Sequence, residues 1–212
     1  TIEFLAGDNG DFYFLEMNTR LQVEHPVTEW VTGVDLVRWQ IRIAAGEPLT
    51  LNQQDIRWTG SAIECRVYAE DPENDFLPSP GRITHYTEPG GPGVRVDGAV
   101  YAGWTVPLEY DPLLAKLCVW SDTRGSAIER MRRALAEYRV LGITTNLRMF
   151  SQLMMDEAWR AGELHTGLLE EFQKRQIQTA PEPYTRIAAL LAAAQAARKP
   201  IASPAQNGQS AW

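Results

Sequence analysis

Cysteine, histidine and excess basic charge are all scarce in this chain. Its 212 residues include two cysteines and three histidines, and the formal net charge is −7. This acidic balance argues against a nucleic-acid partner, because nucleic-acid surfaces need a basic patch. The histidines are far apart and show none of the spacings of a metal site. The composition therefore excludes a nucleic-acid-binding surface and a histidine-based metal centre.

Long hydrophobic runs are missing as well. No run approaches the roughly 18 apolar residues of a membrane span, and no secretory signal begins the chain. We therefore expect no membrane association and a cytoplasmic protein. Disulfides are rare in that compartment, so Cys65 and Cys118, which lie in apolar runs typical of strands, are expected to be buried free thiols.

A polar segment at residues 14–26, with the sequence FLEMNTRLQVEHP, is the most informative part of the chain. Alternate side chains of an extended backbone share a face, so one edge would carry five polar groups. These groups are Glu16, Asn18, Arg20, Gln22 and Glu24. Carboxylate and amide oxygens are typical Mg²⁺ ligands, and a guanidinium binds planar oxyanions. The segment therefore predicts a metal ion beside an oxyanion, with Glu24 as a candidate base.

The residues before this segment predict a β-hairpin. Two β-forming runs flank the turn sequence GDNG at residues 7–10. If the loop is residues 8–11, Leu5 pairs with Phe14 and Glu3 with Glu16. Opposed carboxylates destabilise a sheet unless a cation lies between them, so this register predicts a metal site shared by Glu3 and Glu16. A shifted register would leave both acids in water.

Periodicity and turn residues predict the elements that follow. Asp111, before a proline, is expected to be a turn residue, and Lys116 a solvated charge on a strand. Helices are predicted over 32–46, 123–138 and 145–155, with an Ala-rich helix over 184–199, and strands over 61–69, 82–88, 93–97 and 114–121. This order predicts an α+β domain with a small antiparallel sheet.

The run EMNTRLQVEHPVTE at residues 16–29 closely resembles the end of the ATP-grasp domain of biotin carboxylases. That component is shared by acetyl-CoA, propionyl-CoA, methylcrotonyl-CoA and pyruvate carboxylases. The similarity covers residues 1–172 and includes the segments GVDL (33–36), RIAAG (42–46), AEDP (69–72), FLPSPG (76–81), PGGPGVR (89–95) and YDPLLAK (110–116). The resemblance implies the C-terminal part of an ATP-grasp domain at 1–50, a biotin carboxylase C-terminal domain at 51–175, and an Ala/Pro-rich linker or tail at 176–212.

The resemblance also implies cofactors and a reaction. Glu3, Glu16 and Asn18 match the ligands of the Mg²⁺ (or Mn²⁺) ions that accompany ATP. The implied reaction is the ATP- and bicarbonate-dependent carboxylation of biotin by way of carboxyphosphate. It is the first half-reaction of an acyl-CoA carboxylase, and acetyl-CoA carboxylase of fatty acid biosynthesis or propionyl-CoA carboxylase is the expected enzyme.

Five residues match positions that handle bicarbonate and biotin in that family. Arg20, Gln22 and the Val23 backbone resemble the bicarbonate cradle, and Glu24 resembles the general base that deprotonates bicarbonate. Arg95 matches the arginine that stabilises the enolate-like form of biotin. Without the resemblance, base rates favour a solvated Arg95 beyond an ordinary surface turn.

The implied partners lie on other chains or domains. A Met-Lys-Met biotin attachment site is absent from the sequence, so biotin would arrive on a biotin carboxyl carrier protein or domain. A separate carboxyltransferase and a second copy in a homodimer complete the implied partners. Because Thr1 would begin inside an ATP-grasp strand, we expect a fragment that is inactive on its own.

Two other functions remain open. One is another ATP-grasp carboxylate-amine ligase, such as a carbamoyl-phosphate type enzyme, which has no reason for the PGGPGVR loop. The other is a noncatalytic module that mediates contacts between subunits, against which the retained magnesium acids argue.

Overall fold

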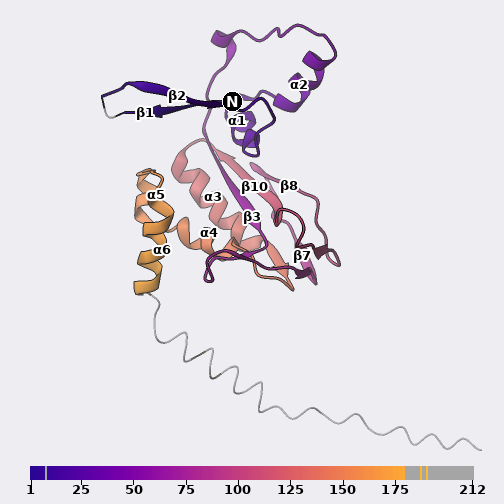
Figure 1. Ribbon diagram of the computed structural model, residues 1–212, viewed down its shortest axis with the longest axis vertical. Coiled ribbons are helices and arrows are strands. Elements are labelled where there is room, and N and C mark those ends of the chain that lie inside the picture. The colour runs from indigo at the N-terminus through magenta and orange to yellow at the C-terminus, as the bar shows by residue number, and fades with distance from the viewer. Residues whose placement is uncertain (8, 180–186, 188–189, 191–212) are drawn as a thin grey trace, which may run out of the picture. The chain divides into compact units, whose positions relative to one another are not determined.

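The computed structural model describes residues 1–7, 9–179, 187 and 190 (Figure 1). The chain divides into two compact units, Thr1–Leu164 and His165–Trp212. The second unit contains the helix α6, Leu168–Thr179, which continues past the predicted start of a linker at residue 176. The predicted Ala-rich helix over 184–199 falls almost entirely outside the described residues. Within the first unit, one three-stranded sheet is the largest of the described sheets.

This sheet has the antiparallel order β3-β10-β8. Its strands are β3 (Ser61–Tyr68), β10 (Leu113–Ser121) and β8 (Val94–Gly98), which confirms three of the predicted strands. Cys65 lies opposite Leu117 across the β3–β10 pair, and Glu64 lies opposite Cys118. Because side chains alternate along a strand, the two cysteines point to opposite faces, where both are buried and free as predicted.

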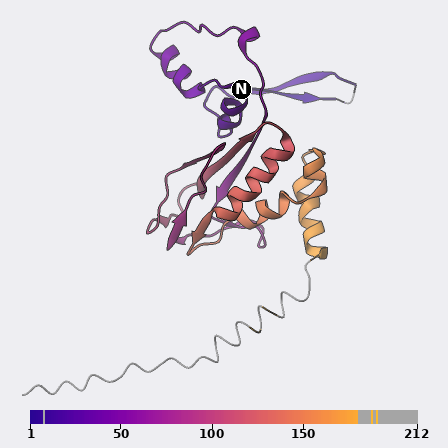
Figure 2. The same ribbon diagram turned by 180° about the vertical axis from the view of Figure 1, so that it is seen from behind.

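One face of the sheet is apolar and is covered by the helix α3, Arg124–Glu137 (Figure 2). Val67, Leu117 and Val119 on this face are fully buried. The helix begins as predicted, because the Thr123 side chain accepts a hydrogen bond from the Ser126 N–H at 3.2 Å. This layer is the main core of the first unit.

The opposite face of the sheet is polar and packs against the helix α1, His25–Thr32. Trp30 of α1 stacks on Trp120 of β10, with ring centroids 6.4 Å apart. Sequence periodicity did not predict α1, whose eight residues give too short a window. The helix ends at Gly33, which adopts the left-handed conformation with a φ of 70°.

The predicted hairpin is present as β1 (Ile2–Ala6) and β2 (Phe12–Met17). Glu3 lies opposite Glu16, as predicted. The predicted pairing of Leu5 with Phe14 is wrong, because Leu5 lies opposite Tyr13. A β-bulge beside Glu3 absorbs the one-residue difference, so the two acids meet although the loop register is shifted.

Smaller elements complete the fold. The predicted helix over 32–46 begins later than expected, as α2 (Leu36–Ala44), with Asp35 accepting from the Arg38 N–H. The third predicted helix is present as α4 (Leu147–Leu153). The predicted strand over 82–88 is divided between two short strands, at residues 81–82 and 85–87. The remaining elements are η1 (Gln53–Asp55), β4 (Glu70–Asp71), β5 (Leu77–Pro78), β6 (Gly81–Arg82), β7 (His85–Thr87), β9 (Thr105–Val106), β11 (Arg139–Leu141) and α5 (Glu157–Ala161). Within the described part of the chain, none of the helices has the length and hydropathy of a membrane span.

Candidate functional site

The hairpin brings together three oxygen-bearing side chains that the sequence analysis assigned to a metal. The Asn18 amide nitrogen donates to Glu3 Oε1 and to Glu16 Oε1, each at 3.0 Å. Both carboxylates therefore converge on one point, which an amide N–H₂ group occupies in this structure. Two carboxylates and an amide oxygen form a donor set that suits a hard divalent cation. Among the described residues, no group of three or more His, Cys, Asp and Glu side chains is arranged to hold a metal ion, so the amide of Asn18 would be needed as the third ligand here.

The backbone after Met17 differs from the prediction. β2 ends there, and residues 18–24 form an irregular segment and a turn that lead into α1. An extended edge carrying all five polar groups is therefore wrong. The departure has a local cause, because His25 Nδ1 donates to the Gln22 carbonyl at 2.7 Å and the His25 N–H points to the same oxygen.

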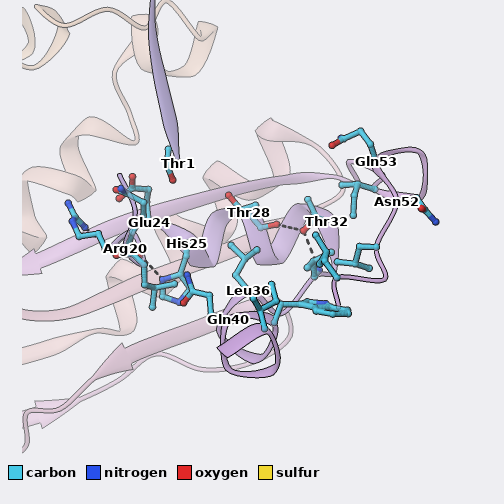
Figure 3. Close-up of a pocket in the computed structure, with 18 residues that line it drawn as sticks. Thr1, Arg20, Glu24, His25, Thr28, Thr32, Leu36, Gln40, Asn52 and Gln53 are labelled. Atoms are coloured by element: carbon cyan, nitrogen blue, oxygen red, sulfur yellow. Dashed lines mark hydrogen bonds between the residues drawn. The ribbon is translucent and has the colours of Figure 1, made fainter. Parts of the chain in front are cut away.

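Three of the five polar side chains nevertheless line one cavity, of about 620 Å³. Figure 3 shows Arg20, Glu24 and His25 together at one end of this cavity. The Gln22 amide nitrogen is buried and has no hydrogen-bond partner. An unpartnered buried donor is costly, so this group suits an oxyanion ligand. Thr1 also lines the cavity and exchanges backbone hydrogen bonds with Asn18, which connects the cavity to the carboxylate pair.

The sheet supplies a guanidinium that the sequence analysis missed. Arg66 of β3 donates to Glu24 Oε2 at 2.7 Å, although 42 residues separate the two. Glu64 lies beside Arg66 and accepts from the Cys118 thiol at 3.3 Å. Burial raises the pKa of Glu64, against smaller opposing effects of the Cys118 hydrogen bond and of Lys116. The sequence did contain a signal for Glu64 and Arg66: both are charged residues at alternate positions of a strand whose intervening residues are apolar.

Lys116 is not the solvated charge that was predicted. Its side chain is 14% exposed, and Nζ donates to the Val23 carbonyl at 3.2 Å and lies 3.3 Å from Asp97 Oδ2. Burial alone would raise the pKa of Asp97, but hydrogen bonds from Arg95 and Lys116 outweigh it and lower the pKa. Asp111 is the turn residue that was predicted, since its carboxylate accepts from the Leu113 N–H.

Arg95 lies apart from the groups that line the cavity. Its guanidinium makes two bonds to Asp97, at 2.7 and 2.8 Å, and one to Glu29 of α1 at 2.7 Å. The hydrogen bonds to Asp97 are the largest effect and raise the pKa of Arg95 further. The loop before it is shaped by glycine, because a Cβ at Gly93 would lie 2.6 Å from the Trp120 carbonyl oxygen.

Comparison with known families assigns the chain to one of them. The family model described as the biotin carboxylase C-terminal domain matches residues 64–171, just over half of the chain. The chain belongs to the biotin carboxylase family. Residues 1–52 match the model described as the carbamoyl-phosphate synthase L chain, ATP binding domain. The fold is therefore mixed α+β, the end of an ATP-grasp domain followed by a biotin carboxylase C-terminal domain, as predicted. The predicted boundaries at 50/51 and 175/176 stay predictions.

Curated relatives of this biotin carboxylase region include several carboxylases. A pyruvate carboxylase component from Methanothermobacter thermautotrophicus is 55% identical over 82% of this chain and 35% of that protein. A biotin carboxylase of a Nostoc species is 52% identical over 82% of this chain and 39% of that protein. The 2-oxoglutarate carboxylase small subunit of Hydrogenobacter thermophilus is 51% identical over 81% of this chain and 36% of that protein. The chain therefore spans between 35% and 39% of the length of these relatives.

Solved structures give the same result. One is the biotin carboxylase domain dimer of the 2-oxoglutarate carboxylase of H. thermophilus, in complex with MgADP, ADP and bicarbonate. It has a TM-score of 0.80 and 48% identity, over 85% of this chain and 40% of that one. The biotin carboxylase subunit of a pyruvate carboxylase has a TM-score of 0.79 and 48% identity, over 82% of this chain and 38% of that one.

Proposed function

We propose that this chain forms the bicarbonate-activating part of a biotin carboxylase. The observation that carries the proposal is the cavity lined by Arg20, Gln22 and Glu24, together with the buried, unpartnered amide nitrogen of Gln22. A cation, a neutral donor and a carboxylate in one cavity suit bicarbonate, a small planar anion that must be held and deprotonated. The full reaction, carboxylation of biotin with ATP, would belong to the full-length protein.

The carboxylate pair would hold the metal of the nucleotide. Glu3 and Glu16 already converge on one point, and a turn of the Asn18 amide would present its oxygen there in place of nitrogen. A bound Mg²⁺ (or Mn²⁺) would neutralise negative charge on the phosphates of ATP. The role of the three residues is to orient the nucleotide toward the cavity, to which Thr1 connects them.

Glu24 would act as the base. It takes the proton of bicarbonate, whose oxygen attacks the γ-phosphorus of ATP and displaces ADP, and the product is carboxyphosphate. Arg20, the Gln22 amide and the Val23 backbone would hold the anion during this step. Carboxyphosphate then breaks into carbon dioxide and phosphate, and the phosphate takes the N1 proton of biotin. N1 attacks carbon dioxide, and carboxybiotin forms.

The arginine that supports biotin needs a revised proposal. Its guanidinium must face the oxygen of the biotin ureido group, on which charge develops. Arg95 was predicted for this role, yet its guanidinium is occupied by two hydrogen bonds to Asp97 and one to Glu29. Arg66 fits the role better, because its guanidinium contacts Glu24 and its side chain is 42% exposed.

Partners and the final acceptor follow from the same proposal. A biotin carboxyl carrier protein or domain would deliver biotin, a carboxyltransferase would use carboxybiotin, and two copies would form a homodimer. The H. thermophilus domain of known structure is a dimer, which supports the last point. Acetyl-CoA or propionyl-CoA as acceptor stays a prediction, since relatives of similar identity include pyruvate and 2-oxoglutarate carboxylases.

A carbamoyl-phosphate type ligase is the second candidate, because a model of that name matches residues 1–52. Such an enzyme would share the metal-binding acids. The biotin carboxylase C-terminal domain at residues 64–171 favours the first candidate.

The deciding experiment measures ATP hydrolysis by the full-length protein as a function of bicarbonate, with and without free biotin. We expect hydrolysis that requires bicarbonate and is stimulated by biotin. Glu24→Gln should lower kcat/KM for bicarbonate by about 10²- to 10⁴-fold, the usual contribution of a general base.

Glu73→Gln is the matched control, because Glu73 is 73% exposed and pairs with Arg148 away from the cavity. Its activity should equal that of the wild type. Hydrolysis indifferent to biotin would favour the ligase, and no hydrolysis would favour an assembly module.

A further inference from the structure

Two cations lie side by side on the polar face of the sheet. Lys116 of β10 is the direct register partner of Arg66 of β3. Like charges opposite one another destabilise a sheet, so this pair needs compensating partners. Consecutive residues of the turn before α1 supply them, because Arg66 binds the Glu24 carboxylate and Lys116 binds the Val23 carbonyl. The sheet therefore binds the turn through hydrogen bonds to two consecutive residues.

Lys116 is itself anchored on its other side. Asp97, its register partner on β8, lies 3.3 Å from Nζ. Asp97 is held by Arg95 through two hydrogen bonds, and Arg95 binds Glu29 of α1 at 2.7 Å. This chain of contacts runs from Glu29 of α1 through Arg95, Asp97 and Lys116 to Val23, in the turn before the same helix. The Lys116 ammonium consequently has little freedom to move away from the carbonyl.

A cation fixed against a carbonyl fixes a whole peptide plane. The peptide group is rigid, so holding the Val23 oxygen also sets the Glu24 N–H. The fixed Val23 peptide group also limits the directions in which the side chains of the neighbouring residues Gln22 and Glu24 can point. Both of these side chains belong to the cavity proposed to bind bicarbonate.

We propose that Lys116 is a positioning residue for the bicarbonate site, acting through the Val23 peptide and anchored by Asp97. The proposal rests on the proposed function for its link to bicarbonate. The contact to Val23 is independent of that function, so it is tested separately. Lys116 touches no substrate in this proposal.

The first test is hydrogen–deuterium exchange of the full-length protein, read in peptides that contain residues 20–25. Lys116→Met keeps the length of the side chain but removes its donors. We expect faster exchange in these peptides, with little change in peptides of α3. Lys116→Arg, which keeps a donor, should restore slow exchange. Unchanged exchange in Lys116→Met would overturn the proposal, whatever reaction the protein catalyses.

The second test separates the substrates. Lys116→Met should raise KM for bicarbonate about tenfold, the effect of one lost hydrogen bond from a charged donor, while KM for ATP stays within about twofold of the wild type. Asp97→Asn, which removes the anchor but keeps the lysine, should shift KM for bicarbonate in the same direction by less. Lys174→Met is the control, because Lys174 is 67% exposed and pairs with Glu170 on α6.

The outcomes distinguish this proposal from the proposed function. If the wild-type protein shows no bicarbonate-dependent hydrolysis, the proposed function fails, and exchange alone decides the contact. Normal bicarbonate kinetics in all variants would overturn the positioning role. An equal rise of KM for ATP and bicarbonate would also overturn it, because such a rise indicates general loss of structure. If Lys116→Met does not fold, Asp97→Asn carries both measurements, with smaller expected changes in exchange and in KM for bicarbonate.

Discussion

The carboxylate pair, Glu3 and Glu16, and the turn at residues 22–24 are neighbours in sequence but are held in different ways. Glu3, Glu16 and Asn18 are placed by one hairpin, through hydrogen bonds within the first 18 residues. Val23 and Glu24 are placed by side chains 93 and 42 residues away, on a sheet formed later in the chain. The first group is therefore a local construction, and the second depends on the tertiary fold.

Burial follows the same division. The side chains of β2 are all exposed, whereas Val67, Leu117 and Val119 of the sheet are fully buried. A hairpin alone has little apolar burial to hold it, and additional layers are normally needed for stability. The sheet has such a layer in α3. Substitutions in the two regions should therefore differ in both the size and the reach of their effects.

The largest effect is expected from a substitution in the apolar core of the sheet that holds the turn. Leu117→Ala leaves a cavity in the core layer and should lower the free energy of unfolding by about 2–5 kcal/mol. Leu15→Ala in β2 is the matched control, because that side chain is 51% exposed, and it should change the value by at most about 0.5 kcal/mol. Equilibrium urea unfolding measures the free energy of unfolding of both variants and of the wild-type chain. Equal losses in the two variants would contradict the comparison.

A smaller and purely local effect is expected in the hairpin. Asn18→Ala removes the side chain that joins Glu3 to Glu16, while the backbone bonds to Thr1 remain. The Mg²⁺ concentration for half-maximal ATP hydrolysis by the full-length protein should rise roughly 10- to 100-fold. Unchanged KM for bicarbonate would show that the two regions act separately.

Asn9→Ala is the control for this experiment. Asn9 lies in the hairpin loop, and its side chain bonds to Asp11 alone among the hydrogen bonds of the described residues. Its Mg²⁺ dependence should match that of the wild type. A parallel rise in Asn9→Ala would mean that the hairpin, and not the carboxylate pair, had been damaged.

The smallest effect concerns the charge of Glu64, which faces Cys118, Lys116, Arg66 and Glu24. Burial raises its pKa above the ordinary value of 4.5, so the folded state disfavours the ionised carboxylate. The contribution of Glu64 to the free energy of unfolding is thus fully present below pH 4.5, and it is lost as the pH rises through the raised pKa. Glu64→Gln removes this loss. Its Tm relative to the wild type should be about 2 °C higher at pH 8 than at pH 4, and a difference independent of pH would contradict the assignment.

Much of the fold could be predicted because its signals are local. Alternation identified β3, an apolar run indicated β10, and Thr123 identified the start of α3. The short helix α1 was missed, because eight residues give little periodicity. Facing Glu3 and Glu16 were predicted from an assumed loop length, and the β-bulge shows that the loop register itself was different.

The sequence by itself determined the family, the facing pair of acids in the hairpin and three of the polar residues that line the cavity, because each is carried by a short run of residues. Only the tertiary structure decided which distant cations hold the turn. Arg66 and Lys116 became neighbours through the pairing of β3 with β10. Burial then changed Lys116 from an expected surface charge into a partner of the Val23 carbonyl. Such contacts depend on strand register and on how α1 covers the sheet, and neither is encoded in a local pattern.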